Sequence, residues 1–421
     1  MNKLQPCDVL IIGAGPSGSV SAALLHQQGF RVCVLEQQHF PRFVIGESLL
    51  PYCMDILEEA GLRQVVDATP GFQYKNGAAF TWGDRYTSID FTRKFTPGPG
   101  TTFQVQRAVF DKILIDEVAK RGVDVRFGHA VTGLHEEAEG MRISVASAEG
   151  HYQLAARFVL DASGYGRVLP RLLDLERPSS LPPRRAIFTH IDDHIVSERF
   201  DRNKILISTH PVWRDVWSWF IPFSNGRTSI GIVGLPERFE RPEIGTDEQT
   251  LLQRFIAEIP MLNSLLTQAV WDNGVPVRSL SNYSANVSTL HGRGFALLGN
   301  AAEFLDPVFS SGVTVAMHSA RLASRLLGRQ LQGEAVDWQR DYADPLMVGV
   351  NAFRTYVMGW YDGSFQDVIY CPEDKINEEV RQMISSILAG YAWDETNPFV
   401  QKSTRRLKAL AELCGSQQVS P

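Results

Sequence analysis

Several features are scarce in this chain, and each scarcity excludes a class of protein. The cysteines are few and scattered, with no C-x-x-C pair, so neither a disulfide framework nor a cysteine-bound metal is expected. The 41 basic residues are outnumbered by 47 acidic ones, and the net charge of −6 gives no basic surface for nucleic acid. The sequence shows no internal repeat or low-complexity tract.

Apolar runs are short throughout, and none reaches the length of a membrane span. The first expected strand, at Asp8–Ile12, begins so early that no secretory leader fits before it. We therefore expect a soluble, cytoplasmic protein. With 421 residues, of which 44% are hydrophobic, the chain is long enough for a large core and more than one domain.

A nucleotide-binding pattern opens the chain. An apolar strand at residues 7–12 leads into the turn Gly13–Gly18, a helix follows to about Gln28, and Arg31–Glu36 forms a second strand. In a G-x-G-x-x-G turn, glycines allow the tight bend, the approach of phosphate and close helix–strand packing. The predicted dinucleotide contacts are Gly13, Gly15, Pro16, Ser17 and Gly18, with Glu36 for the ribose hydroxyls. An ordinary strand–turn–helix is the alternative.

The rest of the chain alternates between two kinds of sheet. Buried strands at Arg157–Asp161 and Phe295–Leu298 extend the parallel pattern, whereas residues 184–235 predict an antiparallel sheet. Most of the chain from about residue 313 onward is expected to be helical. The predicted units are a discontinuous nucleotide-binding domain (1–75, 101–175 and 276–330), a β-rich substrate domain (76–100 and 176–275) and a C-terminal helical region (331–421).

A second glycine-rich segment, Gly299–Gly312, has the features of the other end of the same cofactor site. It ends where an apolar helix begins, and the free N–H groups there suit an anion or a flavin carbonyl. Arg107, just before a helix predicted at 109–121, is a candidate cation for the pyrophosphate or flavin edge; a surface salt bridge is the alternative. The two glycine-rich segments together predict FAD.

Separate segments between about residues 7 and 320 resemble the FAD-dependent monooxygenase superfamily and, within it, the short flavin-dependent halogenases that act on phenols, pyrroles and carrier-bound aromatics. The segments are Gly13–Gly18, Phe40–Pro51, Tyr74–Gly77, Leu160–Gly164, Trp217–Pro222 and Gly299–Gly312. The Trp-x-Trp-x-Ile-Pro block is the most diagnostic. The resemblance implies an α/β fold in which a Rossmann-like FAD-binding domain, of the glutathione reductase and p-hydroxybenzoate hydroxylase kind, is interleaved with an antiparallel β-sheet substrate domain and followed by helices.

The resemblance also implies an activity. FAD, reduced by a separate reductase or by NAD(P)H, would form a flavin hydroperoxide that oxidises chloride or bromide to hypohalous acid. This acid would halogenate an electron-rich aromatic, free or on an acyl or peptidyl carrier protein. Lys75 matches the lysine that holds the acid or forms a chloramine; a solvent-facing lysine in a turn is the alternative.

Further site residues follow from the same resemblance. The additional FAD contacts would be Arg42, Ser48, Arg107, Asn300, Asp306, Gly312 and Val313. The wall between flavin and substrate would be Trp217, Trp219, Ile221 and Pro222, and the halide would lie at Ser310, Ser311 and Gly312. Two tryptophans two residues apart equally suit the buried face of a sheet. No metal is expected.

Two positions depart from the family pattern. Phe309 stands where the tryptophan halogenases have a glutamate, which leaves the general base unassigned. Asn300 replaces an aspartate that accepts a hydrogen bond from a ribityl hydroxyl, although the amide oxygen can still accept one.

Other functions stay open on the sequence alone. The scaffold fits a flavin monooxygenase, dehydrogenase or reductase that does not halogenate. A flavoprotein that binds FAD and a ligand as a sensor or carrier is a third alternative. Aromatic residues near helical spacing in the C-terminal region predict either a packed helix face or a substrate lid. They are Phe353, Tyr356, Trp360, Tyr361 and Phe365.

Overall fold

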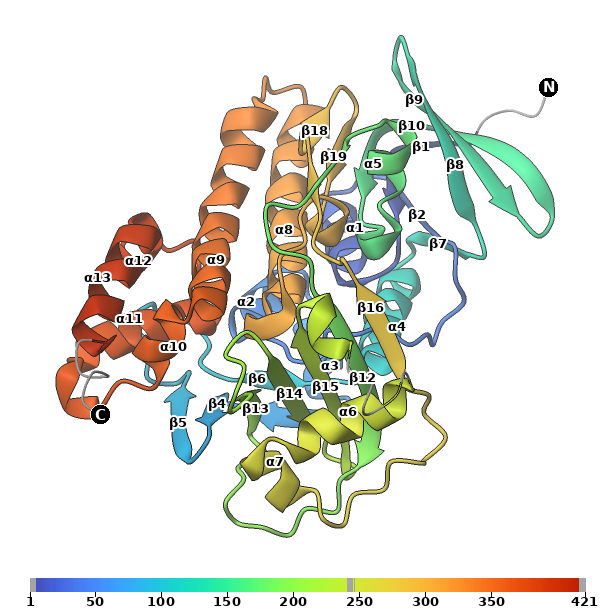
Figure 1. The fold of residues 1–421 in the computed structure, drawn as a ribbon. Helices are drawn as coiled ribbons and strands as arrows, with labels where there is room; N and C mark the ends of the chain where they lie inside the picture. The colour runs from blue at the N-terminus through green and yellow to red at the C-terminus, as the bar shows by residue number, and fades with distance from the viewer. Residues whose placement is uncertain (1–4, 241–244, 246, 416–421) are drawn as a thin grey trace.

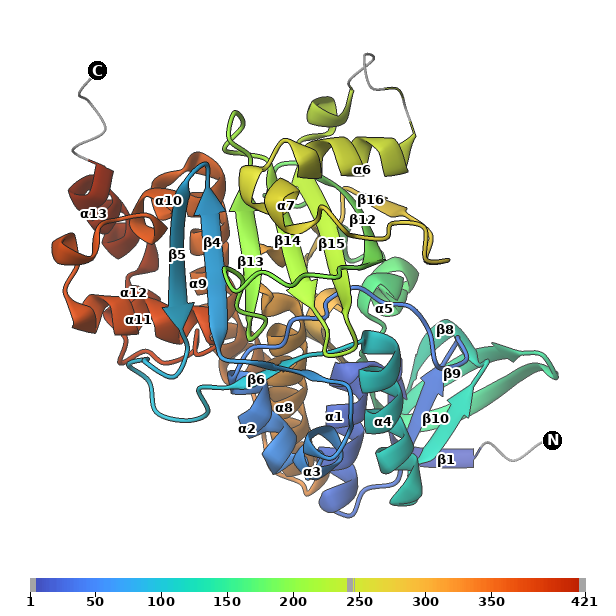
Figure 2. The ribbon, with the colours of Figure 1, turned by 90° about the horizontal axis from the view of Figure 1, so that it is seen from below.

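Two sheets organise the chain, and helices cover them from several sides (Figure 1). The computed structural model describes residues 5–240, 245 and 247–415. The first sheet carries the nucleotide-binding pattern, and the second lies at its side with the C-terminal helices beyond it (Figure 2).

The first sheet is parallel at its centre. Its strands follow the order β18–β19–β10–β1–β2–β7, and β8 and β9 extend it through antiparallel pairing with β10. Val9, Leu10 and Ile11 alternate between the two faces yet are all fully buried, so both faces of the sheet are packed. The strands are β1 (Gln5–Ile12), β2 (Val32–Glu36), β7 (Asp124–Phe127), β8 (Ala130–Glu137), β9 (Gly140–Ser147), β10 (Gly150–Asp161), β18 (His291–Gly292) and β19 (Phe295–Leu297).

The helices that cover this sheet include α1, which follows the first strand and packs against the long helix α8 from the distant second glycine-rich segment. The two helices therefore bring both predicted ends of the cofactor site to one side of the sheet (Figure 1). The helices of this layer are α1 (Pro16–Gln27), α2 (Tyr52–Glu59), α3 (Arg63–Asp67), α4 (Arg107–Lys120), α5 (Val168–Leu172) and α8 (Ser311–Leu331).

The second sheet has the order β16–β12–β15–β14–β13–β4–β5 and is antiparallel except where β13 pairs with β4 in parallel. Its strands are β4 (Gly77–Trp82), β5 (Arg85–Asp90), β12 (Arg185–Asp192), β13 (Lys204–Thr209), β14 (Trp217–Pro222), β15 (Arg227–Gly234) and β16 (Arg278–Ser281). One face packs against α6 (Glu248–Ala257) and α7 (Pro260–Leu265) through Phe220, Ile230 and Phe255, and the other faces the nucleotide-binding layer. Short two-stranded pairs join β3 (Gln73–Lys75) to β6 (Thr102–Gln104) and β11 (Glu176–Arg177) to β17 (Asn286–Val287).

The C-terminal helices lie beyond the β5 edge of the second sheet (Figure 2). Trp360 packs against Phe80 of β4 at a ring-centroid distance of 5.9 Å, and Arg214 forms a 2.8 Å ion pair with Asp367. Phe353, Tyr356 and Trp360 are fully buried on one helix, as the packed helix face predicts, whereas Phe365, also fully buried, lies on the next helix. The helices are α9 (Asp344–Asp362), α10 (Ser364–Ile369), α11 (Glu378–Leu388), α12 (Pro398–Gln401) and α13 (Ser403–Gly415).

The predicted α/β fold, with its parallel nucleotide-binding sheet and following helices, is confirmed. The strand predicted at Arg157–Asp161 begins too late, because β10 runs unbroken from Gly150 to Asp161. This strand pairs first with β9 and then with β1 and β19, so one strand serves both the hairpin and the parallel sheet. The division into three sequence-defined units stays a prediction.

Candidate functional site

A large cavity of about 1080 Å³ lies where the two sheets meet. It runs from the turn after β1 to the inner face of β14 and the start of α8. Most of the residues predicted for the site line it. They are Gly13, Gly15, Pro16, Ser17, Glu36, Arg42, Ser48, Arg107, Trp217, Trp219, Ile221, Asn300, Ser310, Gly312 and Val313. Gly18, Lys75, Pro222, Asp306 and Ser311 do not line it.

In the glycine turn, a Cβ atom would fit at the position that faces the cavity but would clash at the positions that face the protein. Gly13 has φ +100°, and a Cβ there would lie 2.6 Å from the carbonyl oxygen of Ala162. A Cβ on Gly18 would lie 2.0 Å from the oxygen of Gly13. At Gly15 the nearest atom would be an Arg42 nitrogen at 3.7 Å, so the backbone there is open to a ligand. The following N-terminus of α1 has no side-chain cap, which suits a pyrophosphate.

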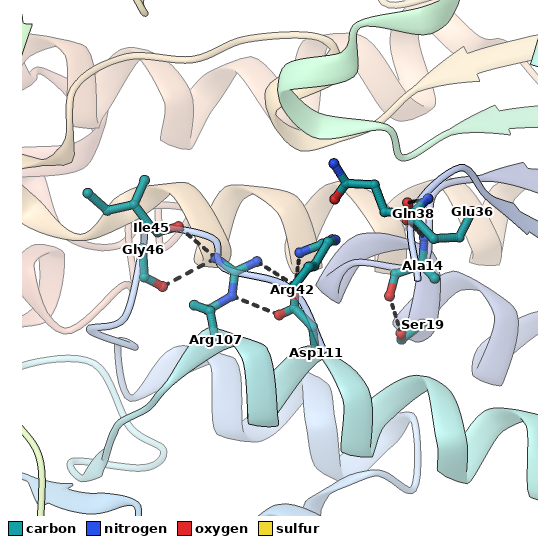
Figure 3. A network of polar contacts seen from close by, with 9 residues as sticks. All are labelled: Ala14, Ser19, Glu36, Gln38, Arg42, Ile45, Gly46, Arg107 and Asp111. Carbon is teal, nitrogen blue, oxygen red and sulfur yellow. Dashed lines mark hydrogen bonds and ion pairs between the residues drawn. The ribbon is translucent and has the colours of Figure 1, made fainter. Parts of the chain in front are cut away.

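Glu36 closes this end of the cavity (Figure 3). Its Oε2 accepts a 3.0 Å hydrogen bond from the N–H of Ala14, and its Oε1 accepts one of 2.9 Å from Gln38. The carboxylate is thereby fixed beside the glycine turn, and each oxygen keeps a lone pair for a ribose hydroxyl. Open space at Gly15, an uncapped helix and an oriented carboxylate together fit the adenosine diphosphate part of FAD.

Arg107 is buried and holds the loop that borders the middle of the cavity (Figure 3). Its guanidinium makes two hydrogen bonds to Asp111, of 2.7 and 3.0 Å, and a third nitrogen donates to the carbonyls of Ile45 and Gly46. Arg42 donates to the same carboxylate at 3.1 Å. Arg107 is 7% exposed, so its salt bridge with Asp111 is buried and not at the surface; its contact with the cofactor stays a prediction.

The second glycine-rich segment reaches the cavity through its last residues. Ser310 adopts a left-handed conformation with φ +57° and caps α8, which begins at Ser311. Ser310 and Gly312 line the cavity, whereas the Ser311 side chain borders a small separate space beside Asn300. The N–H groups of the first turn of α8 have no partner within the helix and can bind an anion.

Asp306, in the same segment, faces the protein interior. Its Oδ2 accepts hydrogen bonds from Tyr283 at 3.1 Å and Tyr361 at 2.7 Å, while Oδ1 accepts the N–H of Val308 at 3.0 Å. Tyr361 in turn accepts a 3.0 Å bond from Nε1 of Trp217. Burial raises the pKa of Asp306, and these donors act in the opposite direction. The carboxylate therefore links the start of a 3-10 helix, Pro307–Phe309, to α9 and β14.

Trp217, Trp219 and Ile221 alternate along β14 and point into the cavity, whereas Ser218 and Phe220 point to the opposite face. The two indole rings are 6.0 Å apart. Trp219 lies flat over Gly231, where a Cβ would be only 2.3 Å from its ring, and its Nε1 donates to Ser229 at 3.1 Å. The neighbouring strand is therefore shaped to hold this ring against the cavity.

Lys75 is fully buried behind the cavity wall. Its Nζ donates to Oγ of Ser48 at 2.6 Å and to the carbonyl of Leu49 at 2.8 Å, and Ser310 donates to the same serine oxygen at 3.0 Å. Burial lowers the pKa of the amine to about 7. Because Ser48 and Ser310 line the cavity, the amine is one hydrogen bond away from it. The alternative of a solvent-facing lysine is excluded.

Sequence reasoning missed one buried polar pair at the same site. Glu47 lines the cavity, and its Oε1 lies 2.6 Å from Nε2 of His190 on β12. Glu47 lies in the Phe40–Pro51 segment that resembles the family. Its sequence neighbours do not indicate a contact with a histidine 143 residues away. Phe188 on the same strand and Ile205 and Ile207 on β13 add an apolar surface that no short motif marks.

Within the described part of the chain, no group of three or more His, Cys, Asp or Glu side chains could hold a metal ion. No helix among the described residues is both long and apolar enough to cross a membrane.

The glycine geometry separates cofactor binding from folding. We expect Gly15→Ala to leave the melting temperature of the FAD-free protein nearly unchanged but to weaken FAD binding by about tenfold or more, since its Cβ would project into the cavity. Gly18→Ala should instead destabilise the fold by about 1–3 kcal/mol, because its Cβ meets backbone. Thermal melts and fluorescence titration with FAD measure both. Equal loss of stability in the two variants would contradict this assignment.

The buried amine also predicts a pH effect on stability. Between the folded pKa of about 7 and the ordinary lysine pKa of 10.5, the unfolded chain binds more protons than the folded chain, so rising pH stabilises the fold. The free energy of unfolding should therefore rise with pH in the wild type relative to Lys75→Met. The expected slope of the difference is up to about 1.4 kcal/mol per pH unit across this window. Urea unfolding at several pH values checks the slope. A pH-independent difference would contradict a desolvated lysine.

Comparison with known proteins places this site in a family. Residues 6–345 match the family model described as an FAD binding domain. A tryptophan 2-halogenase of Chondromyces crocatus is 30% identical over 330 residues, 77% of this chain and 62% of that protein. A 1H-pyrrole-2-carbonyl peptidyl-carrier-protein chlorinase of Pseudomonas fluorescens is 29% identical over 347 residues, 75% of this chain and 74% of that protein.

Among solved structures, a protein from Cytophaga hutchinsonii described as a flavoprotein/dehydrogenase is 41% identical, with a TM-score of 0.92. The match covers 98% of this chain and 99% of that one. The shared fold thus extends through the C-terminal helices, whereas the chain spans only 62% of the length of the tryptophan 2-halogenase. The chain belongs to the FAD-binding domain family and, within it, to the flavin-dependent halogenases.

Proposed function

We propose that the protein is an FAD-dependent halogenase that transfers chloride or bromide to an electron-rich aromatic compound. The observation that carries this proposal is the environment of Lys75. Its amine is fully buried, has no carboxylate partner among the described residues, and reaches the cofactor cavity through Ser48 and Ser310. A lysine that served only stability would gain an acidic partner or solvent.

Each remaining part of the site has a role in this reaction. When bound, reduced FAD supplies the oxidising chemistry that converts a halide into hypohalous acid with O2. The N–H groups of Ser311 and Gly312, at the start of α8, would hold the halide. Trp217 and Trp219 would keep water and the organic substrate away from the cofactor.

The lowered pKa makes Lys75 suited to hypohalous acid. With a pKa of about 7, a large fraction of the amine is neutral near neutral pH and can attack the halogen, while the protonated fraction can donate a hydrogen bond to the acid. Ser48 stands between the amine and the cavity. Rotation of the Ser48 side chain, which moves its oxygen, would open the path.

The substrate and partners are inferred more broadly. Phe309 in place of the glutamate of the tryptophan halogenases favours a phenol or pyrrole, whose electron-rich ring needs less help to lose its proton. One relative is named for a pyrrole carried on a peptidyl carrier protein, which supports a carrier-bound substrate. A separate flavin reductase would supply reduced FAD, and a cytoplasmic location fits these partners.

Asn300 lines the cavity and can accept one hydrogen bond from the ribityl chain through its amide oxygen.

The direct test supplies purified protein with FAD, a flavin reductase, NADH and bromide or chloride. Free phenols, and phenols or pyrroles on a carrier protein, serve as substrates, and mass spectrometry scores the products. The proposal predicts a halide-dependent mass increase. Reoxidation of reduced flavin without any halogenated product would instead favour a monooxygenase or dehydrogenase on the same scaffold.

Removal of the Lys75 amine should abolish halogenation selectively. We expect Lys75→Met to lower the halogenation rate by about 10²-fold or more, while FAD binding and O2 consumption persist, because the amine acts after the oxidant forms. Lys204→Met is the matched control: this lysine on β13 forms a 2.6 Å ion pair with Asp201 and is not part of the cavity. Equal losses in the two variants would show that Lys75 has only a structural role.

A further inference from the structure

We propose that Glu47, held by His190, is the residue that sets the reduction potential of the bound flavin by placing a buried negative charge beside its ring. The inference rests on FAD binding and holds whether or not the protein halogenates. Neither Glu47 nor His190 takes part in the hydrogen bonds that connect Lys75, Ser48 and Ser310.

The Glu47 carboxylate is an unusual group for a protein interior. The residue is 1% exposed, and Oε1 lies 2.6 Å from Nε2 of His190, a contact that requires a shared proton. Oε2 is buried without any hydrogen-bond partner among the described residues, although it belongs to a residue that lines the cavity. An unpaired buried carboxylate oxygen is costly, so a donor from a ligand is expected there.

The other acids that line the cavity are already engaged. Both oxygens of Glu36 accept backbone N–H groups at the adenosine end. Glu176 pairs with Arg167 at 3.0 Å, and Glu248 pairs with Arg185 at 2.9 Å. Among these lining acids, Glu47 is therefore the one whose carboxylate keeps an unpaired buried oxygen and has no lysine or arginine within ion-pair distance.

The position of Glu47 assigns it to the flavin end of the cavity. Since the glycine turn and Glu36 take the adenosine diphosphate, the isoalloxazine ring must lie at the opposite end. Glu47 is there: the next residue, Ser48, is hydrogen bonded to Ser310 at the start of α8, and the Gly46 carbonyl is held by Arg107.

The surroundings of the pair make its charge effective. The ring of His190 lies between Phe43, at a centroid distance of 5.5 Å, and Phe223, at 5.4 Å. Phe188 stacks on Phe43 at 6.3 Å and contacts Trp219 at 5.8 Å. Phe43 is 37% exposed, but Glu47 itself is 1% exposed, so water screens its carboxylate weakly and the charge acts strongly on its neighbour.

The sign of the effect follows from electrostatics. A nearby anion disfavours adding electrons to the flavin, so the carboxylate lowers the potential and makes reduced FAD a stronger reductant towards O2. His190 opposes part of this charge through its shared proton. Removing the acid should therefore raise the potential, and removing the histidine should lower it.

The test is a spectroscopic redox titration of the FAD-loaded protein against reference dyes, without O2 or halide. We expect Glu47→Gln to shift the redox equilibrium about tenfold towards reduced FAD, which is about 30 mV for a two-electron couple. His190→Asn should shift it in the opposite direction. Glu36→Gln is the matched control, since it removes a buried cavity carboxylate at the adenosine end and should weaken FAD binding without changing the potential.

An unchanged or lowered potential in Glu47→Gln would overturn the proposal, as would an equal shift in Glu36→Gln. If Glu47→Gln fails to fold or to bind FAD, the reduction potential of His190→Asn tests the proposal by itself. An unchanged or raised potential in His190→Asn would then overturn the proposal. Failure of halogenation with these shifts intact would count against the proposed function and leave this inference standing.

Discussion

The architecture of the site depends on one buried carboxylate, Asp306. It is 2% exposed and accepts hydrogen bonds from two tyrosines and a backbone N–H, so three donors hold its carboxylate in place. Through Tyr361 it ties the C-terminal helix α9 to Trp217 on the cavity wall. This polar network therefore joins the segment before α8, the second sheet and the C-terminal helices, in addition to the Trp360–Phe80 and Arg214–Asp367 contacts.

Because these parts are held together, the Lys75 amine can lie close to the cavity without lining it. Lys75 is packed beneath the cavity floor, and only the hydroxyl of Ser48 connects it with the space that FAD would fill. In the proposed reaction, the oxidant would form in the cavity and would be held at Lys75, outside it.

Local features of the site could be predicted from the sequence, and long-range ones could not. Gly13, Gly15 and Glu36 were identified because the spacing of one strand–turn–helix–strand unit determines their geometry. A motif predicts that Asp306 binds the cofactor, but in the structure its side chain accepts hydrogen bonds from tyrosines 23 and 55 residues away. The Glu47–His190 contact spans 143 residues and depends on how the two sheets meet, which no short pattern encodes.

In the proposed site, one cavity holds FAD with a halide at the start of α8, within reach of the Ser48–Lys75 pair. A crystal structure with FAD and bromide, analysed by anomalous scattering, would locate both ligands. We expect the isoalloxazine ring between Glu47 and the tryptophans of β14, with a bromide peak beside the N–H groups of Ser311 and Gly312. A flavin ring placed elsewhere, or an occupied FAD site with bromide bound only at the protein surface, would contradict it.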